Sequence, residues 1–277
     1  MATISAADVQ RLRQMTGVGM MDCKKALTEA NGDFDAAVDL LRKRGQKVAA
    51  NRADRDAKEG VVLVRSSTDG SRGVVVEVNA ETDFVSRNDD FLAYASQIAD
   101  LALEHGPADV EALNALAFDD RMTVAEASVE MTGKIGEKIG VRRVTTVEAP
   151  SGGKVVTYLH PGSRLGVLVV AEGEGADGPA RDAAMQVAGM NPVALSADEV
   201  PAEIKAKELE IGRETARAEG KKEEMLDRIA EGKLSRYYKD NVLLEQPFIK
   251  DASTTVGAML KNAGVTVSRY VRYALGD

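Results

Sequence analysis

The sequence predicts an α+β protein built from several parts, and three observations support this prediction. Apolar residues recur at helical spacing through the first 45 residues. Short β-branched runs alternate with helical patterns across the middle of the chain. From Pro201 to about Asp240 the residues are mostly Lys, Glu, Arg and Ala. We therefore expect an N-terminal helical module, a mixed core and a protruding antiparallel helical hairpin.

The first 45 residues are expected to form three short helices with a thin core. Ser5 is a suitable N-cap, and Asp8 stands at the third helical position, where a capping partner belongs. Glycine and Asn-Gly words separate the apolar patterns, as they do at helix ends. The helices are expected to begin near Ser5, Met20 and Asp33 and to end near Gly17, Asn31 and Gly45.

The segment from Arg42 to Lys58 is locally basic. It contains seven basic and only two acidic residues, with Ala and Gly between them. One interpretation is a solvated linker, and the other is a contact with RNA. The basic residues are Arg42, Lys43, Arg44, Lys47, Arg52, Arg55 and Lys58.

The core pattern occurs twice. Two β-branched runs flank Thr68–Ser71, which predicts a hairpin, and a helix follows from about Asn88 to His105. A capping box at Thr123 and Glu126 predicts another helix. Two further strands are predicted at Val144–Val147 and Val155–Leu159. A second Gly-Ser-Arg motif then precedes a strand at Leu165–Val170 and a helix over about 179–189. We expect two related α+β subdomains, and one interpretation of their similarity is duplication.

The charge-rich segment after Pro201 predicts two helices around Gly220. Its few apolar residues are expected to form the seam between them, namely Leu209, Met225, Leu226 and Ile229. A helix over about 254–262 and a last strand over about 265–273 should follow. The expected division is a helical module at 1–45, a basic linker at 46–58, a core N-subdomain at 59–143, and a core C-subdomain at 144–277 with the hairpin inserted at about 201–240.

Composition restricts the class of protein. The chain has 277 residues, of which 44% are apolar and 29% charged, as in folded water-soluble proteins of more than one domain. The net charge of −8 argues against extensive nucleic-acid binding, which needs concentrated Lys and Arg. Cys23 is the only cysteine, and neither a signal pattern nor an apolar run of about 20 residues is present. We therefore expect a cytoplasmic protein that needs no membrane.

Motifs for catalysis are missing from the sequence. The two histidines, His105 and His160, are far apart, and no Cys or His pair has metal-ligand spacing. Gly17-Val18-Gly19 follows a helix rather than a strand and lacks a third glycine, so it is interpreted as a turn rather than a phosphate loop. We expect no enzyme activity, no cofactor, no bound metal and no nucleotide site.

One connection stands out between a strand and the next helix, in the word Glu77-Val78-Asn79-Ala80-Glu81-Thr82-Asp83-Phe84-Val85-Ser86-Arg87-Asn88. It places the apolar pair Phe84-Val85 among polar residues. Phe84 either folds back as a lid on the local core or points outward as an anchor for a partner pocket. The residues alone leave both interpretations open.

Two long words resemble signatures of bacterial elongation factor Ts. The first is Thr16-Gly17-Val18-Gly19-Met20-Met21-Asp22-Cys23-Lys24-Lys25-Ala26-Leu27, and the second runs from Glu77 to Arg87. Tyr158-Leu159-His160, the segment Arg164–Val169 and Gln246-Pro247-Phe248 also resemble the family, in the same order along nearly the whole chain.

The resemblance implies a guanine-nucleotide exchange factor for the GTPase elongation factor Tu. It implies that the first module resembles a ubiquitin-associated domain and docks on the GTPase. It also implies that the loop Thr82, Asp83, Phe84 and Val85 inserts beside the magnesium site of the partner. Further contacts implied by the resemblance are Arg13, Met20, Met21, Lys24, Ile135, Gly136 and His160.

Several of these expectations have alternatives. Met20 and Met21 would otherwise pack in the core, and at least one of them is expected to point inward. His160 would otherwise be a surface histidine at a strand end. Some family members continue into a further C-terminal helical module, and the contact made by that module is expected to be absent here. Rival functions are RNA or ribosome binding through residues 42–58, an unrecognised enzyme, and a ubiquitin-type adaptor.

Overall fold

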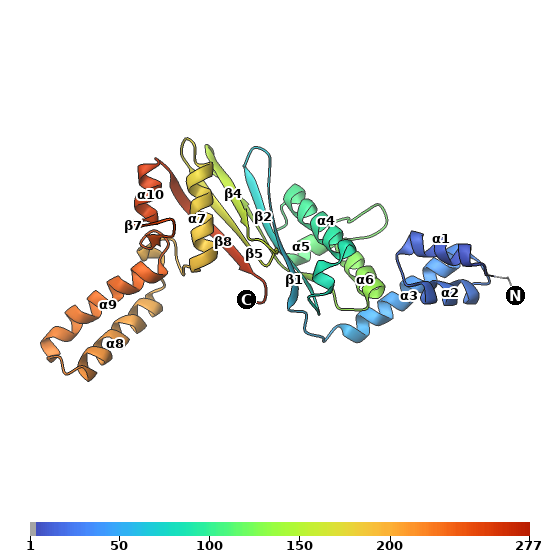
Figure 1. Ribbon diagram of the computed structural model, residues 1–277, viewed down its shortest axis with the longest axis horizontal. Coiled ribbons are helices and arrows are strands. Elements are labelled where there is room, and N and C mark those ends of the chain that lie inside the picture. The colour runs from blue at the N-terminus through green and yellow to red at the C-terminus, as the bar shows by residue number, and fades with distance from the viewer. Residues whose placement is uncertain (1–3) are drawn as a thin grey trace. The chain divides into compact units, whose positions relative to one another are not determined.

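A computed structural model describes residues 4–277 and contains both helices and strands, so the α+β prediction is confirmed. The chain divides into two compact units, and Figure 1 labels the helices and strands. The first contains the chain up to Leu63 together with Val76–Thr146 and Ala274–Asp277. The second contains Val64–Val75 and Val147–Tyr273.

Three helices begin the first unit, as predicted. The capping box is present, because the Ser5 hydroxyl accepts from the Asp8 amide at 3.1 Å and the Asp8 carboxylate accepts from the Ser5 amide at 3.0 Å. Leu12, Cys23 and Leu27 are fully buried at the centre of the module. The helices are α1 (Ala6–Thr16), α2 (Met20–Glu29) and α3 (Phe34–Arg52).

The predicted end of the third helix at Gly45 is wrong, because α3 continues to Arg52. Gly45 lies against Gly133 of α6 (Val124–Ile135), and a Cβ on Gly133 would collide with the Gly45 backbone. The glycine therefore allows two helices to approach closely instead of ending one of them. Half of the segment expected to be a linker is thus helical.

A three-stranded sheet and further helices follow the N-terminal helices along the chain. The strand order is β1–β2–β3, with β1 (Glu59–Ser66), β2 (Arg72–Ala80) and β3 (Gly140–Glu148). The predicted helices are α4 (Asp89–His105) and α6, and α6 begins at the expected capping box of Thr123 and Glu126. A short helix that was not predicted, α5 (Val110–Ala115), begins at the N-cap Asp109.

The predicted hairpin turn between β1 and β2 is confirmed. The Ser67 amide donates to the Arg72 carbonyl at 2.9 Å, and Gly70 adopts a φ of 74°, which favours glycine. Hydrogen bonds from Ser67 and Ser71 lower the pKa of Asp69 to about 2. Gly162, in the second Gly-Ser-Arg word, has a similar φ of 86° and also precedes a strand.

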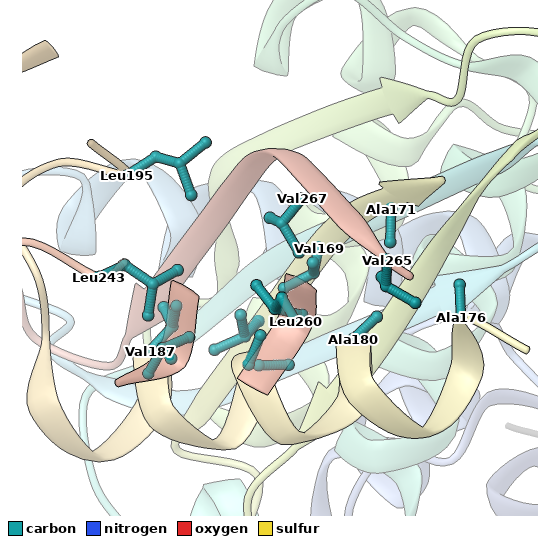
Figure 2. Packing of buried hydrophobic residues seen from close by; sticks show 14 of the residues in the cluster. Val169, Ala171, Ala176, Ala180, Val187, Leu195, Leu243, Leu260, Val265 and Val267 are labelled. Carbon is teal, nitrogen blue, oxygen red and sulfur yellow. The ribbon is translucent and has the colours of Figure 1, made fainter. Parts of the chain in front are cut away.

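The second unit is built on the sheet β4–β5–β8, with β4 (Gly153–Leu159), β5 (Leu165–Glu172) and β8 (Thr266–Ala274). β4 and β5 are antiparallel, with Tyr158 opposite Val167. Helices α7 (Asp177–Met190) and α10 (Val256–Asn262) supply apolar residues to the same core (Figure 2). Both helices agree with the predicted patterns.

The segment after Pro201 forms the predicted helical pair, α8 (Ala202–Ala218) and α9 (Leu226–Asn241). The predicted seam is partly wrong. Leu226 is buried, but Met225 is 44% exposed because a 3-10 turn (Glu223–Met225) precedes α9. Small residues form the closest approach, since a Cβ on Gly212 would lie 2.8 Å from the Ala230 Cα.

The chain between α9 and α10 contains a two-stranded element that the sequence did not predict, β6 (Pro247–Phe248) with β7 (Asp251–Thr255). A buried amide pair supports it. Gln186 of α7 donates to the Gln246 side chain and the Pro247 carbonyl, each at 3.1 Å, and accepts from the Ile249 amide at 2.9 Å. Another 3-10 turn (Ala197–Glu199) lies before α8.

Candidate partner-binding site

The connection from β2 to α4 is short and irregular. The strand ends at Ala80, a 3-10 turn η1 (Val85–Arg87) follows, and the Asn88 side chain caps α4 by accepting from the Asp90 amide at 2.9 Å. All of these residues lie in the first unit. The connection is therefore fixed at both ends by regular structure.

Phe84 points into solvent from this connection. Its side chain is 83% exposed, whereas the next residue, Val85, is only 8% exposed. The alternative in which Phe84 covers the local core is therefore wrong. An aromatic ring exposed to this extent gains little from folding, and aromatic anchors of this kind carry much of the energy of protein interfaces.

Glu81 anchors the start of the connection. Its carboxylate accepts from Arg52 Nη1 at 2.7 and 2.8 Å and from the backbone amide of Lys138 at 2.7 Å. The Lys138 hydrogen bond, followed by the Arg52 interaction, holds the pKa of Glu81 below its usual value. Arg52 stands at the end of α3, so the anchor joins the connection to the helical module.

Thr82 is held by a second carboxylate. Its amide donates to Glu137 Oε2 at 3.0 Å, and its hydroxyl donates to Glu137 Oε1 at 2.8 Å. Glu137 directly follows Gly136, which ends α6 in the left-handed region with a φ of 84°. The expected contacts Ile135 and Gly136 are half-buried and lie next to the residue that binds the expected loop.

Asp83 completes the connection and is only partly engaged. Its carboxylate pairs with Arg87 at 3.1 Å, and its side chain remains 44% exposed. The Asp83 carbonyl accepts from the Ser86 hydroxyl at 2.7 Å, which stabilises the following turn. Asp83 and Phe84 are therefore presented side by side on an anchored backbone.

The N-terminal module presents a second surface. Arg13 and Lys24 are exposed, and Met20 and Met21 are 52% and 66% exposed. The expectation that one of the two methionines packs inward is wrong, because Cys23, Ala26 and Leu27 already occupy the buried face of α2. Met15, at 57% exposure, adds a third exposed methionine on α1.

The turn between α1 and α2 contacts the core of the same unit. Gly17 has a φ of 67°, and a Cβ at this position would collide with the end of the Lys134 side chain of α6. Lys134 in turn pairs with Asp90 at 2.7 Å. The left-handed backbone conformation therefore favours glycine at this position, whereas the end of the flexible Lys134 side chain could move aside for a larger residue.

His160 belongs to the second unit, where it follows β4. The ring is exposed, and its Nδ1 lies 2.9 Å from the Tyr158 hydroxyl. The Tyr158 hydroxyl therefore orients the imidazole ring through Nδ1. This placement suits either a surface histidine or a partner contact.

The basic segment 42–58 is partly used inside the chain. Arg44 pairs with Glu29 at 2.6 Å and Arg52 pairs with Glu81. Arg55 and Lys58 line an open cavity of about 370 Å³ together with residues that include Asn79, Lys138 and Arg142. The segment is thus less free than a solvated linker would be.

Four residues that support the connection were not identified as site residues from the sequence: Glu81, Arg52, Glu137 and Lys138. Their partners are distant in the chain, since Thr82 and Glu137 are 55 positions apart and Glu81 and Lys138 are 57 positions apart. Among these four, only Glu81 was indicated by the family resemblance, because it lies within the second signature motif.

Within residues 4–277, no group of three or more His, Cys, Asp or Glu side chains is arranged to hold a metal ion. Among the same residues, no helix is long and apolar enough to cross a membrane. What the described surface does offer is an exposed aromatic ring on an anchored connection and an exposed set of methionines, which are features of protein–protein contact.

Comparison with known proteins agrees with this description. The family model described as "Elongation factor TS" matches residues 81–277. Elongation factor Ts of Prosthecochloris aestuarii is 46% identical, with full coverage of both chains. Elongation factor Ts of Cytophaga hutchinsonii and that of Alkalilimnicola ehrlichii are each 48% identical to this chain. Each match covers 99% of this chain, with 100% of the Cytophaga hutchinsonii protein and 92% of the Alkalilimnicola ehrlichii protein. Because the similarity is this high along the whole chain, the protein belongs to the elongation factor Ts family of translation elongation factors.

Proposed function

We propose that this protein is a guanine-nucleotide exchange factor that binds the GDP-bound form of elongation factor Tu and promotes release of GDP. The proposal rests on membership of the elongation factor Ts family. The observation that carries it is Phe84, which is 83% exposed on a connection anchored by Glu81 and Thr82. The protein then acts in the cytoplasm and needs no cofactor of its own.

The proposed mechanism is disruption of the magnesium site of the partner by the loop Thr82–Val85. Phe84 is the apolar anchor, and Asp83, beside it, competes for polar groups of the partner. A factor that favours a geometry with a disrupted magnesium site must weaken nucleotide binding by the same factor, because coupling between two binding sites is reciprocal. No covalent step is involved, so no catalytic residue is required.

Other surfaces contribute to binding in this proposal. The N-terminal module docks on the GTPase through Arg13, Met20, Met21 and Lys24, all of which are exposed. Ile135, Gly136 and His160 contact the partner near its phosphate loop, and the helical pair α8–α9 contacts another part of it. Exposed methionines suit docking because their flexible thioethers adapt to a partner surface.

The experiment is release of labelled GDP from elongation factor Tu, followed with and without the purified protein. We expect catalytic amounts to increase the release rate, and the rate should rise with the concentration of the factor. An unchanged rate would overturn the proposal. The same preparation should form a stable complex with nucleotide-free partner, which tests binding separately from exchange.

The alternative, RNA or ribosome binding through residues 42–58, receives weaker support. Arg44 and Arg52 are paired with acidic residues, and the net charge of the chain is −8. This alternative predicts RNA binding that weakens steeply with salt concentration, and it requires no GTPase. Titration of labelled RNA at two salt concentrations separates the two functions.

A further inference from the structure

Glu137 joins two surfaces that are distant in sequence. Its carboxylate binds Thr82, at the start of the exposed connection, while its own backbone follows Ile135 and Gly136 at the end of α6. We infer that Glu137 is a positioning residue that holds Phe84 in the orientation needed for nucleotide exchange. This inference rests on the proposed function. It adds a residue whose carboxylate acts through the loop and does not contact the partner.

The contact with Thr82 is a two-point contact. One oxygen of Glu137 accepts from the Thr82 amide at 3.0 Å, and the other accepts from the Thr82 hydroxyl at 2.8 Å. One hydrogen bond would leave Thr82 free to pivot about it, whereas two restrict both the backbone and χ1. Both bonds have a charged acceptor, which makes them stronger than bonds between neutral groups.

The adjacent residue, Lys138, provides a second restraint. Its backbone amide donates to Glu81 at 2.7 Å, and its Nζ donates to the carbonyls of Ala53 and Arg55 at 2.6 and 3.0 Å. Residues 137 and 138 therefore hold residues 82 and 81, respectively. Lys138 also connects the loop with the residues that directly follow α3.

The other end of the loop is restrained by burial. Val85 is 8% exposed, and the Asn88 amide donates to the Val85 carbonyl at 2.9 Å. Only Asp83 and Phe84 lie between the two sets of restraints. The structure thus confines the backbone of Phe84 while leaving its ring in solvent, which is the arrangement expected for a pre-organised anchor.

Pre-organisation matters because an unrestrained loop loses conformational freedom when it binds. Without the Glu137 carboxylate, the loop should be more mobile in the free protein and should lose that conformational freedom when it binds the partner. We expect exchange by Glu137→Ala to be roughly tenfold less efficient at a low concentration of the factor. The effect should be smaller at saturation, because the bound state itself is unchanged.

The test uses six full-length proteins: wild type, Glu137→Ala, Glu137→Gln, Phe84→Ala, the double variant Phe84→Ala/Glu137→Ala and the control Glu130→Ala. Glutamine can still accept from the Thr82 amide and can donate to the Thr82 hydroxyl, so Glu137→Gln should recover most of the activity. If Glu137 acts through Phe84, the double variant should be no slower than Phe84→Ala alone. Glu130→Ala removes an exposed carboxylate from α6, the helix that ends just before Glu137; it is the matched control and should behave as wild type.

A second readout needs no partner. Amide hydrogen exchange of the free protein should be faster over residues 81–85 in Glu137→Ala than in wild type or Glu130→Ala, with helices α4 and α6 unchanged. If exchange over 81–85 is unchanged, or if the effects of Glu137→Ala and Phe84→Ala on GDP release simply multiply, the inference is wrong. If the wild-type protein does not accelerate GDP release from elongation factor Tu, the proposed function is wrong. The hydrogen-exchange result still decides whether Glu137 positions the loop.

Discussion

Glu77 and Phe84 lie seven residues apart in one signature word, and their environments are the reverse of what their chemistry suggests. Glu77, a charged residue on β2, has an exposed fraction of 0%, whereas the aromatic ring of Phe84 is 83% exposed. Charged residues are rarely buried completely unless they are paired, and large aromatic rings are rarely so exposed. Each exception therefore needs its own explanation.

Glu77 is explained by its partners within the first unit. Its carboxylate binds Arg142 at 3.0 Å and Arg143 at 2.7 Å, and it accepts from the Asn79 side chain at 3.1 Å. Arg143 also donates to the carbonyl of Ala274 at 2.8 Å. The buried charge therefore joins β2 and β3 to the end of the chain, and its role is structural.

Phe84 is 83% exposed and has no such explanation within the described residues, and under the proposed function the partner supplies it. The comparison teaches that a signature word can contain two kinds of constraint. Residues that point inward stabilise the fold, and residues that point outward are proposed to bind the partner. The following predictions test this division, from the largest expected effect to the smallest.

Replacing Glu77 should have the largest effect, and the effect should be on stability. Glu77→Ala leaves two arginines beside a buried site without their acceptor, and we expect a loss of about 3–5 kcal/mol in the free energy of unfolding. Urea denaturation of the variant and of the control Glu130→Ala measures this difference. A loss below about 1 kcal/mol would mean that water replaces the carboxylate and that Glu77 has no structural role.

Replacing Phe84 should have the opposite result, with stability retained and GDP exchange slowed. Phe84→Ala should leave the unfolding free energy within about 0.5 kcal/mol of wild type, because the ring is exposed. GDP release should slow by about 30-fold, corresponding to about 2 kcal/mol for an interface anchor. Val85→Ala is the matched control in the adjacent position and should lose stability, by roughly 2 kcal/mol. Equal stability losses for the two variants would end the distinction between inward and outward residues.

The same division should hold on α2. Met21→Ala should leave stability unchanged but weaken association with elongation factor Tu by about 1 kcal/mol, since a flexible apolar contact is lost. Leu27→Ala, on the buried face of the same helix, should instead lose about 2–5 kcal/mol of stability. Calorimetric titration and thermal unfolding of both variants measure the two quantities. Normal association by Met21→Ala would remove this methionine from the docking surface.

The smallest predicted effect is the pH dependence of the Glu81 anchor. The folded pKa of Glu81 lies below its usual value of 4.5, so its stabilising contribution is complete above that value and is lost as the pH falls through the folded pKa. Wild type should therefore exceed Glu81→Gln in stability at neutral pH, and the difference should shrink as the solution is acidified below about pH 4.5. Urea denaturation of both proteins across roughly pH 3–7 measures this difference in stability. A difference that does not change with pH would show that the ionised carboxylate is not what holds the loop.

Local signals in the sequence determined the helix starts and turns of this protein. The capping boxes at Ser5 and Thr123 and the turn at Gly70 form as predicted, because each depends on groups within a few residues of one another. Helix periodicity likewise located α7 and the pair α8–α9. The family signatures directed attention to the loop that contains Phe84.

Only the tertiary structure decided which side chains point inward and which residues hold the loop. Gly45 allows α3 to pass Gly133, although a glycine after an apolar pattern usually indicates a helix end. The partners of Glu77 lie 65 and 66 residues away, and Glu137 lies 55 residues from Thr82. Such pairs leave no periodic or local pattern in the sequence, because chain folding alone brings them within hydrogen-bonding distance. The exposure of Phe84 was decided in the same way, since contacts distant in sequence hold Glu81 and Thr82 while the Phe84 ring stays 83% exposed.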